Sequence, residues 1–402
     1  MSIESFGVNT KDEIWVVSEL FHPETISTGY IMTEIAKSLV NDYNVSVVCG
    51  PEFYEEKINK IEVEKLPNIE IYRIKFKGYN KNNFITRIIG NFRVSYKMLQ
   101  LMKKRIPKEA RILMVTNPII LLVLTSLTIK KRKWKISVLV HDVFPENLIV
   151  SGLLKSKNSF VFRIIKQLFN KTFKKMDKII VLGRDMKKVF EDKIGNKEEI
   201  SVIENWADTL NISSHPMQDK VNKKLLFAGN LGRLQGIEVL LNALKKTEGN
   251  SYTFTFIGSG ALEEYISDFV KKQETNHIEQ YGWISREEQD EFMSDTNVGV
   301  VTLKKGMHGL GVPSKFYNLL AAGKPILYIG DINSELYLVL QENEIGWFAE
   351  AGNLVDISEK LILISNTSNV ELNRKSQNAR DLAVNKYSKE IILNKFNDLF
   401  KN

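Results

Sequence analysis

The chain has 402 residues, which is longer than one hydrophobic core usually supports, so its length alone predicts two domains. Apolar residues make up 43% and charged residues 26%, a composition that is typical of a folded globular protein and excludes a disordered or fibrous one. Cys49 is the only cysteine, which excludes a disulfide framework and a cysteine metal cluster, and with the absence of a secretory signal it predicts a cytoplasmic protein.

The net charge of +8 is distributed unevenly along the chain. Residues 1–205 hold 35 basic and 23 acidic residues, a net charge of +12, whereas the remaining residues hold 21 and 25, a net charge of −4. The first half of the chain is therefore expected to meet an anionic partner that the second half does not meet.

The chain opens with a strand, a loop, a helix and a second strand. Apolar runs at 14–17 and 45–48 read as strands, and apolar residues at helical spacing fill 31–39. This order predicts a doubly wound α/β domain, in which ligands bind beyond the carboxyl ends of the strands. The loop 18–29 lies there. Its last residue, Gly29, would either let the backbone approach a phosphate or serve as a plain turn glycine.

Two basic amphipathic segments follow. Residues 71–108 hold eleven basic residues and no acidic one, and residues 158–178 repeat the theme with phenylalanines among the basic side chains. One apolar face is predicted in the first segment: Ile85, Ile88, Ile89, Phe92, Tyr96 and Leu99. Such a face packs on the core or lies on an anionic membrane, and the lack of acidic residues favours the membrane because solvated faces mix charges. Basic and aromatic residues also suit nucleic acid, but no nucleic-acid motif accompanies them, so no nucleic-acid partner is expected.

The best candidate for a membrane span is 112–129, and Asn117-Pro118 interrupts it. A strand, a turn and a buried helix explain this segment better than a span. The next apolar run, 134–140, is followed at once by His141. This histidine either caps the strand or stands at the carboxyl edge of the sheet where an α/β site is expected.

The second domain is expected to begin after a polar linker at 207–222. A strand at 224–228, a glycine-containing loop and a helix from Ile237 form a layout that cradles phosphate. The glycine spacing does not match the dinucleotide fingerprint. Further strands are predicted at 254–257, 278–283 and 297–303.

The most informative stretch is 311–327. Pro313 suits the first turn of a helix, where the N–H groups of Ser314 and Lys315 are free and the lysine adds a positive charge. Gly323 ends this helix and an apolar strand follows. The local chemistry predicts that an anion, most simply a phosphate, is held at the helix start.

This stretch resembles the donor-site helix of retaining glycosyltransferases of the GT-B fold, in the large family four that builds bacterial surface polysaccharides. Residues 202–208 similarly resemble the segment that closes the first domain in that family. The resemblance implies two Rossmann-like domains that face a central cleft. It places the acceptor-side, membrane-facing domain at 1–206, the nucleotide-sugar domain at 207–385, and a last helix that crosses back to the first domain at 386–402.

The resemblance also implies site residues. His141 would lie near the transferred sugar, and Arg233 and Lys315 would stabilise the diphosphate, so these three are the predicted catalytic residues. The implied donor-binding residues are Gly29, Asn230, Gln235, Tyr281, Trp283, Gly311, Val312, Ser314 and Asn318.

This chain departs from the commonest family pattern at four positions. Asn230 and Gln235 stand where an arginine and a lysine are usual, and Arg233 between them is expected to supply the charge. Leu310 and Asn318 replace two glutamates. Asn318 can still hydrogen-bond a ribose hydroxyl, and the N–H groups of Gly311 and Val312 would serve the sugar in place of the first glutamate.

No Asp-x-Asp pair occurs, so the usual metal-holding motif of the other glycosyltransferase fold is missing, and neither a metal nor another cofactor is expected. Protein donors must then stabilise the leaving UDP. The predicted function is metal-independent, retaining transfer of a sugar from a nucleotide sugar, with UDP favoured, to a polyprenyl-diphosphate-linked saccharide at the inner face of the plasma membrane.

Two other functions fit the same fold. A UDP-sugar 2-epimerase-like isomerase needs carboxylates for acid–base chemistry in the cleft, and the replacement of both glutamates argues against it. A non-catalytic partner protein with a degenerate site would bind no nucleotide sugar.

Overall fold

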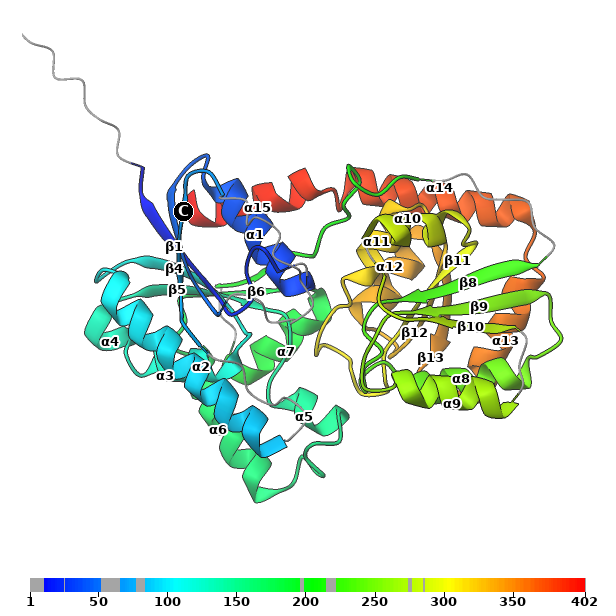
Figure 1. Cartoon of the computed structure of the whole chain (residues 1–402), viewed down its shortest axis with the longest axis horizontal. Coiled ribbons are helices and arrows are strands. Elements are labelled where there is room, and N and C mark those ends of the chain that lie inside the picture. Colours follow the sequence, from blue (N-terminus) through cyan, green and yellow to red (C-terminus); the bar gives the residue numbers. More distant parts are fainter. Residues whose placement is uncertain are drawn as a thin grey trace, which may run out of the picture.

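The computed structural model describes residues 11–24, 26–51, 66–76, 84–195, 199–214, 222–273, 277–284 and 286–401. The chain forms two α/β domains that lie side by side, each built on a parallel sheet with helices on both faces (Figure 1). The predicted fold class, two Rossmann-like doubly wound domains, is confirmed.

The first sheet has the strand order β3-β2-β1-β4-β5-β6-β7. Its strands are β1 (Glu13–Ser18), β2 (Asn44–Cys49), β3 (Ile69–Arg73), β4 (Arg111–Val115), β5 (Lys135–Val140), β6 (Lys178–Val181) and β7 (Ile200–Val202). Its helices are α1 (Ser27–Leu39), α2 (Phe84–Arg105), α3 (Ile119–Ser126), α4 (Ile129–Arg132), α5 (Glu146–Val150), α6 (Phe160–Phe173) and α7 (Arg184–Ile194). The central strands are buried almost throughout, because helices cover both faces, and this explains their continuous apolar runs.

The second sheet has the order β10-β9-β8-β11-β12-β13. Its strands are β8 (Lys223–Ala228), β9 (Tyr252–Ile257), β10 (Ile278–Tyr281), β11 (Val298–Thr302), β12 (Ile326–Gly330) and β13 (Gly346–Glu350). The helices are α8 (Ile237–Lys246), α9 (Glu263–Gln273), α10 (Arg286–Ser294), α11 (Lys315–Ala321), α12 (Glu335–Asn343), α13 (Leu354–Ser365), α14 (Asn369–Asn385) and α15 (Lys389–Lys401).

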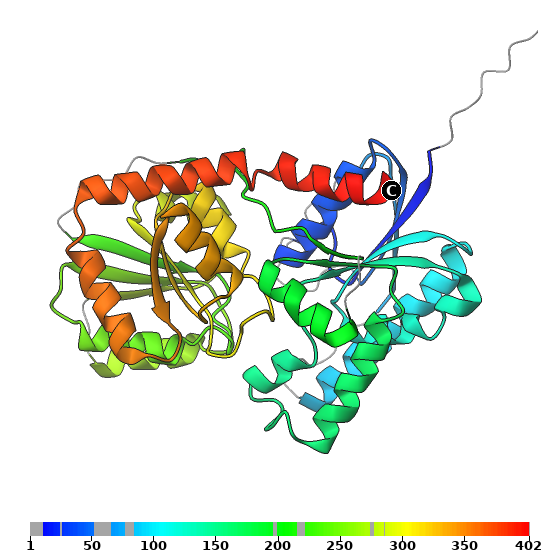
Figure 2. The same cartoon turned by 180° about the vertical axis from the view of Figure 1, so that it is seen from behind.

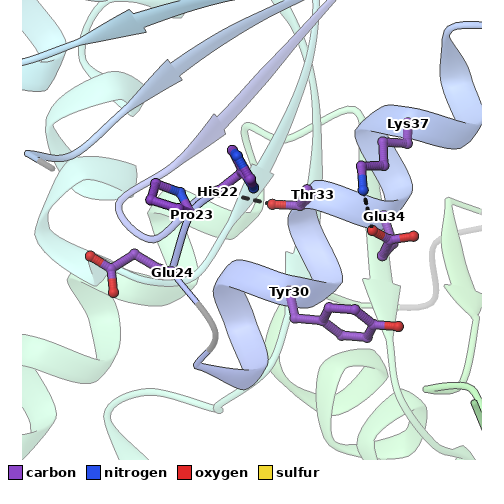
Figure 3. A pocket seen from close by; sticks show the side chains of 7 residues that line it. All are labelled: His22, Pro23, Glu24, Tyr30, Thr33, Glu34 and Lys37. Atoms are coloured by element: carbon purple, nitrogen blue, oxygen red, sulfur yellow. Dashed lines mark hydrogen bonds and ion pairs between the residues drawn. The ribbon is translucent and has the colours of Figure 1, made fainter. Parts of the chain in front are cut away.

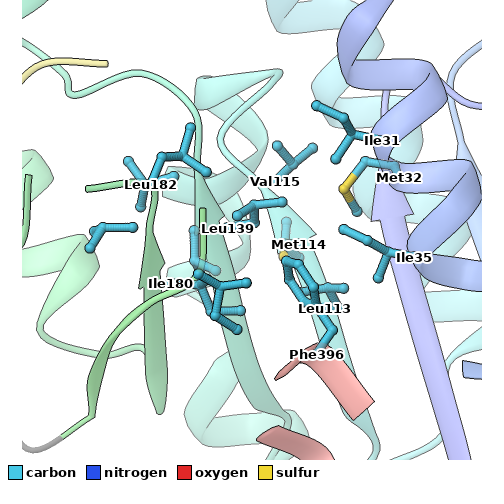
Figure 4. Packing of buried hydrophobic residues seen from close by; sticks show 14 of the residues in the cluster. Ile31, Met32, Ile35, Leu113, Met114, Val115, Leu139, Ile180, Leu182 and Phe396 are labelled. Atoms are coloured by element: carbon cyan, nitrogen blue, oxygen red, sulfur yellow. The ribbon is translucent and has the colours of Figure 1, made fainter. Parts of the chain in front are cut away.

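The last helix packs on the first domain. Figures 1 and 2 show α14 along the second domain and α15, in red, continuing onto the first, where it packs against α1. Phe396 of α15 enters the same core as Ile31 and Ile35 of α1 and Leu113 of β4 (Figure 4). The chain that leaves the first sheet meets the returning chain where Ala207 N–H donates to Tyr387 O over 2.7 Å.

The structure corrects two details of the sequence analysis. Pro313 does not lie in the first turn of α11 but precedes its N-cap, Ser314. Its carbonyl accepts a hydrogen bond from Phe316 N–H, which forms a tight turn just before the helix. The predicted strand 278–283 ends at Tyr281.

The apolar face predicted on α2 is mostly exposed, and only Leu99 of it is buried among the residues whose side chains are described. Val94, Met98 and Met102 are buried together with Leu99, whereas Ile88, Ile89, Phe92 and Tyr96 are about half exposed. The side chain of Ile85 lies outside the described residues. Segment 112–129 forms β4, a turn and α3 as predicted, and in the part of the chain that the structure describes no helix is long and apolar enough to span a bilayer.

Candidate functional site

The candidate site lies where the strand order reverses in both sheets. The chain leaves neighbouring strands β1 and β4 in opposite directions in the first sheet, and β8 and β11 in the second. In doubly wound sheets ligands bind outside the carboxyl ends of the strands at this point. Lys315 follows β11, and His141 follows β5 beside β4. The fold therefore places Lys315 at the reversal point of the second sheet and His141 one strand from the reversal point of the first.

Lys315 is held over the end of β8. Its Nζ lies 3.4 Å from the centroid of the Phe227 ring and is buried without a hydrogen-bond partner among the described residues, although the rest of the residue is partly exposed. The ring face favours the cation, but burial lowers the pKa of Lys315 to about 7. A buried ammonium without a counter-ion is costly, so an anion that enters here is strongly stabilised by it.

Four backbone amides accompany this ammonium. The N–H groups of Gly311, Val312, Ser314 and Lys315 donate to no acceptor within the described residues. Because α11 has only seven residues, its dipole is small and the directed N–H groups matter more than the helix as a whole. Together with Lys315 Nζ they form a set of donors without acceptors, which suits a ligand rich in oxygen atoms.

His141 faces the same region from the first domain. Its Nδ1 lies 3.2 Å from Thr28 Oγ1, and its Nε2 is buried without a partner among the described residues. Burial lowers the pKa of His141 to about 4, so the ring is neutral at physiological pH. When Thr28 donates to Nδ1, the ring proton resides on Nε2, which is then a neutral hydrogen-bond donor for a substrate.

Three contacts join the two domains around these residues. Ser27 at the start of α1 donates to the Ser314 hydroxyl over 3.1 Å, and Val143 N–H donates to Leu310 O over 3.0 Å. Gly311 packs so closely that a Cβ there would lie 3.2 Å from His141 O. Gly311 thus lies directly against the His141 backbone.

The two positions that replace family glutamates differ. Leu310 is buried, and its backbone carbonyl is used by the first domain, so its side chain does not offer a sugar contact. Asn318 lies one turn after Ser314 on α11 and is partly exposed. Its predicted contact with a ribose stays a prediction.

The glycine loop after β8 meets Lys315 at its first residue, because a Cβ on Gly229 would lie 3.5 Å from Lys315 Nζ. Asn230 and Arg233 are exposed, and no contact among the described residues brings the Arg233 guanidinium to Lys315. Gln235 is partly buried, and its side-chain oxygen has no partner within the described part of the chain. The catalytic role of Arg233 and the donor-binding roles of Asn230 and Gln235 remain predictions.

Two exposed aromatic side chains lie at the end of β10: Tyr281 is its last residue and Trp283 follows shortly after it. Their side chains are 41% and 68% exposed, and Tyr281 packs on Phe292 with a centroid separation of 4.9 Å. The carbonyl of Tyr281 accepts from Gly258 N–H, which follows the neighbouring strand β9. The pair therefore lies near the carboxyl edge of the second sheet. That a nucleotide base stacks on these rings stays a prediction.

Gly29 has a packing role in its own loop, because a Cβ there would lie 2.9 Å from Glu24 O. A pocket of about 230 Å³ lies beside this loop and α1, and Figure 3 shows the side chains of Tyr30, Thr33 and Glu34 around it. Its other lining residues are His22, Pro23, Glu24 and Lys37. None of the predicted site residues lines it. Tyr30 and Glu34 are engaged by Asp208 and Lys389 of the crossing segments.

Among the described residues, no group of three or more His, Cys, Asp or Glu side chains is placed to hold a metal ion. The sequence analysis missed several residues that shape the site: Thr28, which orients His141, Phe227, which supports Lys315, and Asp185, which holds the loop before α11. Thr28 and Phe227 stand at the ends of predicted elements, where the ligand contacts of an α/β domain are expected, so their positions could have identified them. No sequence signal indicates the role of Asp185 at the site, since its partners there, Gly309 and Glu335, lie more than a hundred residues away.

Comparisons with known proteins identify the family. Residues 208–382 match the family model for glycosyl transferases group 1. A probable glycosyltransferase of Pseudomonas aeruginosa, WbjE, is 30% identical over 392 residues, which cover 95% of this chain and 96% of that protein.

Two more distant proteins are also similar. A putative colanic acid biosynthesis glycosyl transferase of Escherichia coli, WcaI, is 22% identical over 49% of this chain and 51% of its own. The crystal structure of Anabaena HepE in complex with UDP-glucose superposes with a TM-score of 0.68 at 14% identity, covering 97% of this chain and 99% of that one.

The relative that matches over nearly the whole length decides the family, and the superposition supports the fold. The chain therefore belongs to the group 1 glycosyltransferases and has the GT-B fold.

Proposed function

We propose that this enzyme transfers a sugar from a UDP-sugar to a lipid-linked glycan, with retention of configuration and without a metal. The observation that carries the proposal is the buried Lys315 ammonium, on the same loop and helix start as four backbone N–H groups, all of them without a partner among the described residues. This donor set fits the diphosphate of a nucleotide sugar. The similar HepE structure, which holds UDP-glucose, supports the choice of UDP.

Lys315 and the amides act on the leaving group. When the bond between the anomeric carbon and the phosphate oxygen breaks, its electron pair goes to UDP, and negative charge grows on the diphosphate. Fixed N–H groups and a desolvated ammonium stabilise this developing charge more than water does. Neutral His141 offers Nε2 to the sugar side of the same bond, across the domain boundary.

The acceptor side is proposed to lie on an anionic membrane, at its cytoplasmic face. The exposed apolar residues of α2 follow one stripe along the helix, Ile88, Ile89, Phe92 and Tyr96. α6 carries a second stripe, Phe160, Val161, Ile164 and Leu168, of which Phe160 is 77% exposed. α3 packs against both helices, so one domain presents both stripes (Figure 1). We call these eight residues the apolar stripes.

Exposed basic residues border the apolar stripes, among them Arg93 and Lys97 on α2 and Arg163 and Lys166 on α6. Apolar side chains that enter the headgroup region, flanked by cations that attract anionic lipids, are the features of an interfacial helix. Each basic residue near such a surface contributes roughly 1 kcal/mol. A polyprenyl-diphosphate-linked acceptor would then be reached at the surface where it is embedded.

The test is an assay of UDP release with purified enzyme, a panel of UDP- and GDP-sugars and a polyprenyl-diphosphate-linked saccharide. We expect release that depends on both substrates and is undiminished by EDTA, and a product whose anomeric configuration, read by NMR, equals that of the donor. Loss of release in EDTA would overturn metal independence. An epimer formed without acceptor would instead identify the isomerase.

A further inference from the structure

The starts of two helices from different domains meet next to the candidate site. α7 of the first domain has Gly183 at its N-cap, which has no side chain to cap the helix, and the N-cap Ser334 of α12 makes no capping hydrogen bond with its side chain. Asp185 in the first turn of α7 accepts from Glu335 N–H over 3.1 Å. Glu335 in the first turn of α12 accepts from Arg184 N–H over 2.6 Å. Each helix is therefore capped by a carboxylate of the other domain.

We call Arg184, Asp185 and Glu335 the clasp. The two carboxylate residues are buried, and the Arg184 guanidinium neutralises Glu335 at 3.0 Å and also contacts Glu342. This contact is polar, and it lies beside a buried apolar cluster that includes residues of both domains, among them Leu336 of α12. Water can replace the hydrogen bonds of a polar contact when two domains separate. An open form of the molecule would therefore lose the clasp.

Asp185 also holds the loop that leads to the donor site. Its carboxylate accepts from Gly309 N–H over 3.0 Å, while Asp331 of the second domain accepts from Gly306 and His308 N–H. Leu310 N–H donates within the loop, to Met307 O. The loop amides that remain are those of Gly311 and Val312, the two assigned to the donor. Asp185 is the carboxylate from the other domain that fixes the loop just before them.

The close approach depends on two glycines. A Cβ on Gly183 would lie 2.8 Å from Glu335 Cβ, and one on Gly309 would lie 2.5 Å from Val189 Cγ2 of α7. The φ of Gly183 is −163°, extended backbone that any residue adopts, so the backbone itself would accept a side chain, which would meet Glu335 of the other domain and Asp185 Oδ1 at 2.9 Å. Gly183→Ala is therefore a wedge between the domains that removes no hydrogen-bonding group.

We propose that Asp185 is a positioning residue for the transfer reaction. Through the clasp it ties the donor loop to the first domain, so that the Gly311 and Val312 amides are in place only when the domains are closed. The inference rests on the proposed UDP-sugar donor. It predicts that donor affinity depends on residues that do not touch the donor.

The test compares Asp185→Ala, Asp185→Asn and Gly183→Ala with the wild type in the full chain. The probe is UDP, with affinity measured by calorimetry, and domain separation is read as the radius of gyration in solution scattering. If a variant leaves about one-tenth of the molecules closed, affinity falls about tenfold. We expect this loss and a larger radius in Asp185→Ala and Gly183→Ala, and partial recovery in Asp185→Asn, which keeps one acceptor oxygen.

Asp356→Asn is the matched control, because Asp356 accepts from Glu350 N–H within the second domain. It is expected to lower thermal stability without changing UDP affinity or the radius. Hydrogen exchange of the loop 306–312 without ligand is the second measurement, and faster exchange is expected in both clasp variants.

Unchanged UDP affinity and loop exchange in Asp185→Ala and Gly183→Ala, with only thermal stability reduced, would show that the clasp is merely structural. If the wild type bound no UDP, the proposal of a UDP-sugar donor would be wrong. Hydrogen exchange of the loop 306–312 would still decide whether Asp185 positions the loop.

Discussion

At the scale of single residues, Lys315 carries a conflict between stability and function. Its ammonium is desolvated, so its pKa in the folded protein is about 7, far below the ordinary value of a lysine in the unfolded chain. The native state therefore binds fewer protons than the unfolded state between pH 7 and about 10.5. The penalty on folding is full below pH 7, up to about 5 kcal/mol, and disappears as pH rises to the unfolded pKa.

Lys315→Met removes the charge and keeps the apolar stem over Phe227. We expect the variant to be more stable than the wild type at pH 7 and equally stable near pH 10.5, measured by denaturant unfolding. Its transfer rate should fall roughly 10²-fold or more, since a donor to the leaving group is lost. A variant that released UDP at the wild-type rate would contradict the assigned site.

The same pKa predicts how donor binding depends on pH. The diphosphate of a bound UDP-sugar raises the pKa of Lys315 above 7, so the favourable charge interaction is fully present below pH 7 and is lost above it. The dissociation constant for UDP-glucose, measured by calorimetry, should be constant from pH 5.5 to about 7 and then rise up to tenfold per pH unit. His141 should add no change in this range, because its pKa is about 4. A flat profile up to pH 9 would show that Lys315 does not meet the phosphates.

At the scale of helices and strands, the sequence predicted the elements better than their faces. Apolar runs located the central strands, because strands buried on both sides need such runs. α2 shows why faces are harder. It carries two apolar rows, Val94 with Met98 and Phe92 with Tyr96, and only the packing of α3 decides which row is buried. The Asp185–Glu335 contact was likewise beyond sequence reasoning, since it joins elements of two domains.

The apolar stripes give a prediction for α2 and α6. Phe92→Glu combined with Ile164→Glu should weaken binding to vesicles that contain anionic phosphatidylglycerol by at least about tenfold, because two apolar contacts are lost and two negative charges are added. Sedimentation with vesicles measures this. Transfer to a short water-soluble acceptor should be unchanged, since neither residue is at the site.

Leu363→Glu is the matched control for the stripes. Leu363 is 49% exposed on α13 of the second domain, so the substitution replaces an exposed apolar side chain by glutamate away from the proposed membrane surface. Vesicle binding should be unaffected in this variant and should weaken with salt in the wild type. Equal losses in the stripe variant and the control would contradict the proposed orientation.

At the scale of the whole molecule, the crossing helix makes the stability of the first domain depend on the last residues of the chain. Phe396 is 2% exposed and packs among α1 and β4 of the first domain (Figure 4). Lys389 and Lys395 of α15 pair with Glu34 and Glu204, which also belong to that domain. The two ends of the chain therefore close one core, which also includes residues of α11, whereas β8 contributes to a separate one.

This arrangement predicts where Phe396→Ala acts. Truncating a buried phenylalanine costs about 3–5 kcal/mol, and the cost should fall on the first domain. Hydrogen exchange should quicken in β1 and β4 and stay unchanged in β8 and β11. Ile391→Ala on the same helix removes a side chain that is 37% exposed and should change stability by no more than about 0.5 kcal/mol. Faster exchange in the second domain alone would contradict the assignment of α15 to the first core. Lys315 and the four N–H groups proposed to bind UDP lie on the second domain. UDP binding should therefore survive partial loosening of the first domain, and its affinity should fall only to the extent that the clasp opens.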